Sequence, residues 1–307
     1  MSEAVSGLDT RPTASGATRP AGSPPVPARV GVLGGGRMGA GIAHAFLVAG
    51  AHVTVVERDA DAAAAARTRV TDAVATSVAR GTTHEASDVI EARLESVTEV
   101  SAFADAGLVI EAVPEELALK IDALTRVEAV LGEDAVLASN TSSISIDELA
   151  TVLARPSRFL GMHYFNPVPA STLVELVRGT ATDPVLVDDA RLWVEGIGKT
   201  PIVVTDAPGF ASSRLGVAIG LEAIRMLEEG VASAEDIDTA MVLGYKHPVG
   251  PLKTTDLVGL DVRLGIAEYL ASQLGPRFEP PALLRRLVAE GKLGRKTGEG
   301  FYDWTAQ

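Results

Sequence analysis

Residues Arg29-Val-Gly-Val-Leu33 and the Gly34-Gly-Gly-Arg-Met-Gly39 that follows them decide the fold of this chain. The first segment is short and apolar, which predicts a buried strand, and the residues after it predict a helix that continues to Ala49. Gly34, Gly36 and Gly39 fit the G-x-G-x-x-G spacing. The first allows a tight turn, the second lets a pyrophosphate approach the backbone, and the third permits close helix packing. Strand, glycine turn and helix together predict a dinucleotide-binding site.

An acidic residue stands where this kind of site binds a ribose. Residues 51–56 predict a second strand, and Glu57 follows it directly. A carboxylate there accepts hydrogen bonds from the 2′-hydroxyl of NAD and repels the 2′-phosphate of NADP, so NAD is favoured. Arg58 could tolerate that phosphate, but we give Glu57 more weight. The alternative, an ordinary glycine loop in a sheet protein, fits this context less well.

The first two thirds of the chain alternate predicted strands with predicted helices, which implies an α/β fold with a mostly parallel sheet. An alanine-rich stretch at residues 60–79 predicts the second helix. Further apolar strands are predicted at residues 108–111, 135–139, 159–163, 173–177 and 201–204.

Beyond Asp206 the pattern becomes helical. The predicted helices lie at residues 210–229, from Ser233 onward, at 256–274 and at 281–290. We therefore expect an α/β domain at residues 28–205 and a helical domain at residues 206–307. Residues 1–27 are rich in Ser, Ala, Gly, Thr and Pro and are predicted to form a disordered tail.

His163 and Glu175 form a candidate catalytic pair in apolar surroundings. Because apolar side chains occupy both phases of segment 173–177, Glu175 is expected in a strand covered on both faces. An unpaired charge there would cost several kcal/mol, so the carboxylate needs a partner, and His163 is the obvious one. A carboxylate-oriented imidazole can serve as a general base toward an alcohol. The alternative is a core histidine satisfied by Glu175 without chemistry, and the pattern alone leaves both open.

The remaining candidates are weaker. The four other histidines have no apolar-buried carboxylate nearby in sequence, and we expect structural or solvated roles for His44, His52, His84 and His247. Gly198-Lys-Thr200 resembles the end of a phosphate loop, but a strand rather than a helix follows, so a simple turn explains it. The polar residues 139–143 precede Ser145-Ile-Asp-Glu148, whose capping-box spacing predicts a helix start.

Composition narrows the class of protein. A chain of 307 residues with 47% hydrophobic content can form two domains with separate cores. The formal net charge of −13 argues against nucleic-acid binding, which needs clustered Lys and Arg. We see neither an apolar run of about 18 residues for a membrane span nor the apolar block of a secretory signal, so a cytoplasmic location is expected. The absence of cysteine excludes disulfides and thiolate metal sites, and no metal site is expected.

The order of several motifs resembles that of the NAD-dependent 3-hydroxyacyl-CoA dehydrogenases. The motifs lie at residues 34–43, 111–115, 139–143, 161–169 with Glu175, 206–210 and 294–302. The similarity is closest to the short, stand-alone bacterial form that acts on 3-hydroxybutyryl-CoA. The resemblance implies a Rossmann-type, doubly wound sheet that binds NAD, an all-helical C-terminal domain that closes over acyl-CoA, and a homodimer.

The resemblance also implies roles for individual residues. His163 matches the family's base, Glu175 its orienting acid, and Ser142 a hydroxyl donor to the reacting oxygen. Glu115 and Lys120 match residues that line the nicotinamide half of the cofactor site. The residues expected to bind the cofactor are Gly34, Gly36, Arg37, Met38, Gly39, Glu57, Glu115, Lys120 and, as a lesser candidate, Asn140. Those expected to contact substrate are Ser142, Asn166 and Ser213.

Ser213 departs from the family pattern, which has an asparagine at this position after Pro-Gly-Phe. Serine is shorter and offers one donor instead of an amide, so its substrate contact is lost, water-mediated or replaced. The CoA phosphates need cations, and the candidates near the second helix are Arg67, Arg69 and Arg80. A solvated helix face is the alternative explanation for each of these arginines.

The expected activity is hydride transfer between the C3 hydroxyl of a short-chain 3-hydroxyacyl-CoA and NAD, which gives a 3-oxoacyl-CoA. Two alternatives stay open. One is a dehydrogenase of the same fold that acts on a sugar acid or a carrier-linked hydroxyacyl substrate. The other is a non-catalytic NAD-binding structural protein, which the presence of His163, Glu175 and Ser142 together disfavours.

Overall fold

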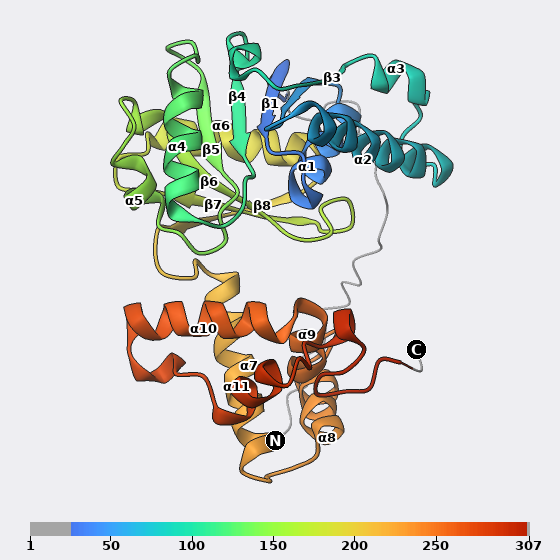
Figure 1. Cartoon of the computed structure of the whole chain (residues 1–307), viewed down its shortest axis with the longest axis vertical. Helices are drawn as coiled ribbons and strands as arrows, with labels where there is room; N and C mark the ends of the chain where they lie inside the picture. The colour runs from blue at the N-terminus through green and yellow to red at the C-terminus, as the bar shows by residue number, and fades with distance from the viewer. Residues whose placement is uncertain (1–25, 306–307) are drawn as a thin grey trace, which may run out of the picture.

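The computed structural model describes residues 26–305 and shows a sheet-containing lobe followed by a helical lobe (Figure 1). The tail predicted at residues 1–27 lies outside the described residues except for Val26 and Pro27. Val26 is partly buried and packs against the first hydrophobic core. No helix in residues 26–305 is long and apolar enough to cross a membrane.

The first lobe is built on one sheet with the strand order β3-β2-β1-β4-β5-β6-β7-β8. The strands are β1 Arg29–Leu33, β2 His52–Val56, β3 Leu94–Val97, β4 Leu108–Glu111, β5 Val136–Ser139, β6 Phe159–Tyr164, β7 Leu173–Arg178 and β8 Thr200–Thr205. All neighbours pair in parallel except β6 and β7, which are antiparallel. The prediction of a mostly parallel, doubly wound α/β sheet is therefore confirmed.

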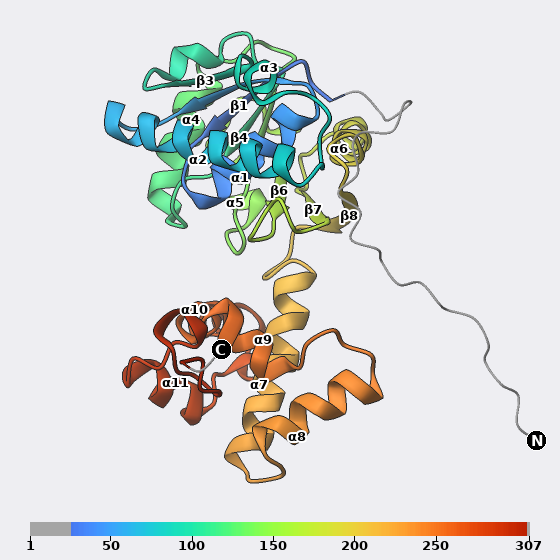
Figure 2. The same ribbon diagram turned by 90° about the vertical axis from the view of Figure 1, so that its right-hand side faces the viewer.

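Helices cover both faces of this sheet (Figures 1 and 2). They are α1 Arg37–Val48, α2 Ala60–Ala79, α3 Ser87–Glu91, α4 Leu117–Glu128, α5 Ile146–Ala150 and α6 Pro184–Gly196. Successive strand residues point to opposite faces. Leu108 and Ile110 of β4 join one core with α1, α2 and α6, whereas Val109 joins a second core with α4 and α5.

The second lobe encloses a core of its own. Its helices are α7 Ser212–Glu228, α8 Ala234–Thr239, α9 Pro251–Val258, α10 Leu260–Leu274 and α11 Ala282–Ala289. Short helical turns complete the described chain at η1 Val100–Phe103, η2 Pro156–Arg158, η3 Ala240–Gly244, η4 Pro276–Phe278 and η5 Arg295–Thr297. The helix start at Ser233 is confirmed, because its side chain accepts a hydrogen bond from the Asp236 amide.

Two details of the elements differ from expectation. The single helix predicted at residues 256–274 is wrong, because Gly259 has φ +107° and separates α9 from α10. Strand β3 was not predicted, because it lies at the edge of the sheet and Leu94 alone among its four residues is fully buried.

The motif at residues 294–302 closes the helical lobe. The buried carboxylate of Asp256 on α9 accepts hydrogen bonds from the amides of Phe301 and Tyr302 and from the Trp304 indole, each at 2.8–2.9 Å. These three donors satisfy a charge that is only 1% exposed. These bonds therefore fix residues 301–304 against α9.

Gly39 and Gly36 offer a test of the turn that begins α1. A Cβ added at Gly39 would stand 1.8 Å from the Gly34 carbonyl oxygen, whereas one at Gly36 would meet nothing within 4 Å. We expect Gly39→Ala to destabilise the protein by at least about 1–3 kcal/mol, the usual cost of overpacking. Gly36→Ala should unfold at nearly the wild-type temperature in a circular-dichroism melt. Equal melting temperatures for the two variants would contradict this packing.

Candidate active site

Candidate residues lie at the carboxyl ends of five neighbouring parallel strands. The glycine turn follows β1, Glu57 follows β2, Glu111 ends β4, the polar loop 140–143 follows β5, and His163 lies one residue before the end of β6. The carboxyl ends of parallel strands are the usual ligand-binding edge of α/β sheets.

His163 and Glu175 are directly opposite each other in the antiparallel pair β6 and β7. Opposed residues in such a ladder point to the same face, so a separation of 12 residues along the chain becomes a contact. His163 Nδ1 lies 2.8 Å from Glu175 Oε2. The histidine side chain is 8% exposed and the glutamate side chain 0%. The aromatic rings of Phe165 and Phe210 flank the imidazole, with centroids at 4.5 and 5.8 Å.

The buried carboxylate of Glu175 has donors on both oxygens. Oε1 accepts the amides of Ala211 and Ser212 at 3.2 and 2.9 Å. Oε2 accepts the Ser212 hydroxyl at 2.6 Å in addition to His163. Burial acts to raise the pKa of Glu175, but the hydrogen bonds from His163 and Ser212 outweigh it and hold the pKa below its usual value.

The charge on Glu175 determines which imidazole nitrogen of His163 is free. An ionised carboxylate has no proton to donate, so Nδ1 of a neutral His163 must carry the hydrogen of the 2.8 Å contact. Nε2 then keeps its lone pair. This arrangement can accept a proton at Nε2 while the carboxylate stabilises the positive charge that results.

A second buried carboxylate organises the loops after β4 and β5. Glu111 is 0% exposed and pairs with Lys120 at 2.7 Å, while Ser139 donates to its other oxygen at 2.5 Å. Lys120 is itself buried and reaches Glu115 at 3.3 Å. The Lys120 side chain, which is 2% exposed, therefore links the buried Glu111 to Glu115.

Glu115 draws the polar loop after β5 toward β4. One of its oxygens accepts the Thr141 hydroxyl at 2.7 Å and the amides of Ser142 and Ser143 at 2.9 and 3.1 Å. Burial favours a higher pKa for Glu115, but the Lys120 charge and these donors lower the pKa below its usual value. In this structure the Ser142 hydroxyl also donates to Glu115, at 3.2 Å.

The other three predicted site residues differ in burial and contacts. The Asn140 side-chain oxygen accepts the Tyr164 amide at 2.9 Å and so ties the loop after β5 to the end of β6. Asn166 is exposed in the turn that follows β6. Ser213 is half-buried in the first turn of α7, next to Ser212.

The glycine turn and the start of α1 fit a dinucleotide. Helix α1 begins without a side-chain cap and without an acid in its first turn, which leaves its positive end open to a phosphate. Arg37 is exposed and Met38 half-buried at that end. The Glu57 carboxylate accepts the Gly35 amide at 2.8 Å, which fixes it beside the turn.

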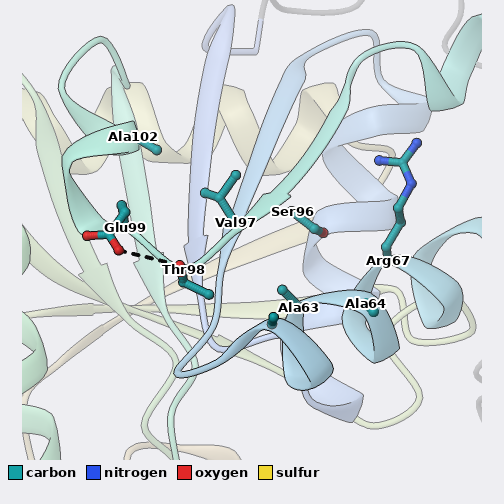
Figure 3. A pocket seen from close by; sticks show the side chains of 9 residues that line it. Ala63, Ala64, Arg67, Ser96, Val97, Thr98, Glu99 and Ala102 are labelled. Carbon is teal, nitrogen blue, oxygen red and sulfur yellow. Dashed lines mark hydrogen bonds between the residues drawn. The ribbon is translucent and has the colours of Figure 1, made fainter.

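A hollow of about 530 Å³ lies between α2 and β3, lined by alanines, by Arg67 and by residues 96–99 (Figure 3). It adjoins Glu57, whose amide donates to the Val97 carbonyl at 2.9 Å. Arg67 donates to the Leu94 carbonyl at this hollow, whereas Arg69 donates to the Gly35 carbonyl at the glycine turn. Arg80 follows the last residue of α2. These three cations therefore do not share one site.

The fold and the glycine turn define an NAD-binding dehydrogenase. Residues 29–207 match the NAD-binding domain of the 3-hydroxyacyl-CoA dehydrogenases, and residues 209–304 match their C-terminal domain. The chain belongs to the 3-hydroxyacyl-CoA dehydrogenase family.

Individual relatives match along nearly their whole length. The chain is 42% identical to a 3-hydroxybutyryl-CoA dehydrogenase of Mycobacterium tuberculosis, over 90% of this chain and 98% of the relative. It is 39% identical to a probable 3-hydroxybutyryl-CoA dehydrogenase of Deinococcus radiodurans, over 90% of this chain and 100% of the relative. The crystal structure of (S)-3-hydroxybutyryl-CoA dehydrogenase from Ralstonia eutropha has 39% identity and a TM-score of 0.87, covering 91% of this chain and 99% of that one.

Sequence reasoning missed two members of these networks. Glu111 could have been suspected, because it ends an apolar strand and begins the motif 111–115. Ser212 gave no such signal, because its partner Glu175 lies 37 residues away and the contact depends on the path of the chain between β8 and α7.

His44 is a structural histidine whose protonation affects stability. It bonds Ser77 of α2 at 2.8 Å, and burial together with the Lys199 charge lowers the pKa of His44 to about 4. The unfolded chain protonates near pH 6.5, so stability is complete above that value and falls between it and pH 4, by about 3 kcal/mol. In His44→Gln, the free energy of unfolding measured with urea should therefore change much less between pH 6.5 and pH 4 than in the wild type. The exposed His84→Gln is the control, and an equal slope in His44→Gln would refute the assignment.

Proposed function

We propose that the protein oxidises a short-chain 3-hydroxyacyl-CoA, such as 3-hydroxybutyryl-CoA, with NAD to the 3-oxoacyl-CoA. The observation that carries this proposal is the buried contact of 2.8 Å between His163 and Glu175 in a chain of this family. The relatives named as 3-hydroxybutyryl-CoA dehydrogenases support the substrate class.

The residues of the proposed site have separate tasks. NAD, when bound, supplies the hydride acceptor. His163 Nε2 takes the proton of the C3 hydroxyl, and Glu175 stabilises the imidazolium that forms. Ser142 turns its hydroxyl from Glu115 toward the C3 oxygen, since a serine hydroxyl rotates freely. In the reverse direction His163 returns the proton.

The proposed cofactor contacts follow from the sheet edge. Gly34, Gly36 and Gly39 shape the turn for the pyrophosphate, with Arg37 and Met38 beside it. Glu57 binds the adenine-side ribose. Glu115 borders the nicotinamide half, Lys120 acts by holding Glu115, and Asn140 by holding the loop after β5. Asn166 and Ser213 are the proposed substrate contacts outside the pair.

The test follows NADH absorbance with three substrates: 3-hydroxybutyryl-CoA, free 3-hydroxybutyrate and a carrier-protein thioester. We expect turnover with the CoA ester to exceed that with the other two.

His163→Ala should lower turnover by about 100-fold or more, because it removes a positioned base. Binding of NAD to this variant, measured by calorimetry, should be nearly unchanged.

The control variant is His84→Ala, which changes an exposed histidine. A preference for the carrier-linked or the free acid, or for a sugar acid added to the panel, would replace the substrate class. Tight NAD binding without turnover on any substrate would instead favour the structural-protein alternative. Near-normal turnover of His163→Ala would refute the assignment of the base.

We further propose that residues 28–205 and 206–307 are separate domains and that the helical one forms a homodimer. Leu215 and Ile219 of α7 are 63% and 38% exposed, and Val262 of α10 is 43% exposed. These three side chains lie on two helices that pack against each other, and a contiguous exposed apolar patch typically marks a protein interface. A cytoplasmic location stays a prediction, as does the absence of membrane and nucleic-acid partners.

Charge placed on the α7 surface tests the dimer. Leu215→Asp should give a monomer in analytical ultracentrifugation, because a carboxylate buried in an apolar interface has no partner. Leu192→Asp on α6 is the matched control, since Leu192 is 45% exposed in the other lobe. A monomeric wild type, or a dimer in Leu215→Asp, would contradict the proposed interface.

A further inference from the structure

We propose that Ser212 is a positioning residue for the catalytic pair. Its hydroxyl and amide orient Glu175 and through it His163, so the first turn of α7 sets the geometry of the base. This inference rests on the proposed function of His163 and Glu175. Among residues 26–305, Ser212 alone donates hydrogen bonds to Glu175 through both its side chain and its backbone.

Helix α7 receives its N-terminal cap from β7. Its own N-cap residue, Ala211, has no side chain that can accept a hydrogen bond, and no acid occupies the first turn. The amides of Ala211 and Ser212 instead donate to Glu175 Oε1. A carboxylate at a helix N-terminus satisfies the open amides and interacts favourably with the helix dipole.

The backbone before α7 brings these donors to the sheet. Gly209 has φ +74° and Phe210 has φ +48°, both in the left-handed region. A residue other than glycine adopts this region only when its surroundings hold it there. Phe210 is 4% exposed, and its ring packs against His163. The same bend thus positions both the Phe210 ring beside His163 and the amides that donate to Glu175.

The Ser212 hydroxyl helps to fix the position of Glu175 Oε2, the oxygen that contacts His163. This oxygen accepts two hydrogen bonds, from Ser212 at 2.6 Å and from His163 at 2.8 Å. With two donors on each oxygen, rotation of the carboxylate would break several charge-assisted bonds at once. Without the hydroxyl, Oε2 keeps His163 as its one donor, while Oε1 keeps the two amides, so the oxygen that orients His163 is held less firmly.

Loss of this donor also changes how readily Glu175 is protonated. The Ser212 bonds lower the pKa of Glu175, so their loss raises it. His163 on β6 is the titratable group that faces the carboxylate among the described residues, and the strand neighbour on β8 is Ile202. The ionised form that orients His163 would then require a higher pH.

The decisive experiment compares Ser212→Ala, Ser212→Thr and the wild-type chain with NAD and 3-hydroxybutyryl-CoA. Ser212→Ala should lower kcat by about 10- to 100-fold, the scale for losing a hydrogen bond to a charged group, with the KM for NAD nearly unchanged. The acidic limb of its kcat/KM profile should move to higher pH. Ser212→Thr, which keeps the hydroxyl, should recover most of the activity.

A matched control separates positioning from helix stability. Ser233→Ala removes the N-cap of α8 in the same lobe, so it should lower the melting temperature without moving the pH profile. If Ser212→Ala lowers only the melting temperature, and kcat stays within about twofold of wild type, Ser212 is merely structural and the inference is overturned.

Failure of the inference is distinguishable from failure of the proposed function. If the wild type turns over no CoA ester, the function is wrong, and the inference is then judged by nuclear magnetic resonance of the His163 ring. In that case the hydrogen-bonded Nδ1 proton should be visible in the wild type and in Ser212→Thr, and lost or strongly shifted in Ser212→Ala. An unchanged signal in Ser212→Ala would overturn the inference.

Discussion

The molecule depends on one buried charge, the carboxylate of Glu175. An unpaired carboxylate in this position would cost several kcal/mol, and donors from β6 and α7 remove that cost. The same group accepts hydrogen bonds from a histidine on the sheet and from the first amides of the helical lobe, so the observed orientation of His163 depends on both lobes. If His163 is the proposed base, this contact serves both stability and chemistry.

A second buried carboxylate, Glu111 at the end of β4, is held in a similar way. Glu111 is held by Lys120 and Ser139, and Lys120 in turn holds Glu115, which collects the donors of the loop after β5. In both networks hydrogen-bond donors lower the pKa of a partly or fully buried carboxyl group, Glu175 in one and Glu115 in the other, below its usual value. The glycine turn, Glu115 and His163 therefore lie at the carboxyl ends of β1, β4 and β6, where the proposed site is located.

Local patterns predicted much of this arrangement, and long-range pairing explains what they missed. The strand, glycine turn and helix of residues 29–48 are encoded by periodicity within a few residues, and Glu57 follows from its place after β2. The contact between β6 and β7 could be anticipated because the two strands are close in sequence. The bond from Ser212 to Glu175 could not, since it joins residues 37 positions apart and depends on how their segments pack.

The most direct test of this account is a crystal structure of the protein with NAD and a 3-oxoacyl-CoA. The account predicts that His163 Nε2 lies within hydrogen-bond distance of the C3 oxygen while Nδ1 stays on Glu175, with the C3 carbon facing the nicotinamide ring. A complex in which His163 has left Glu175, or in which C3 lies out of reach of His163, would contradict it.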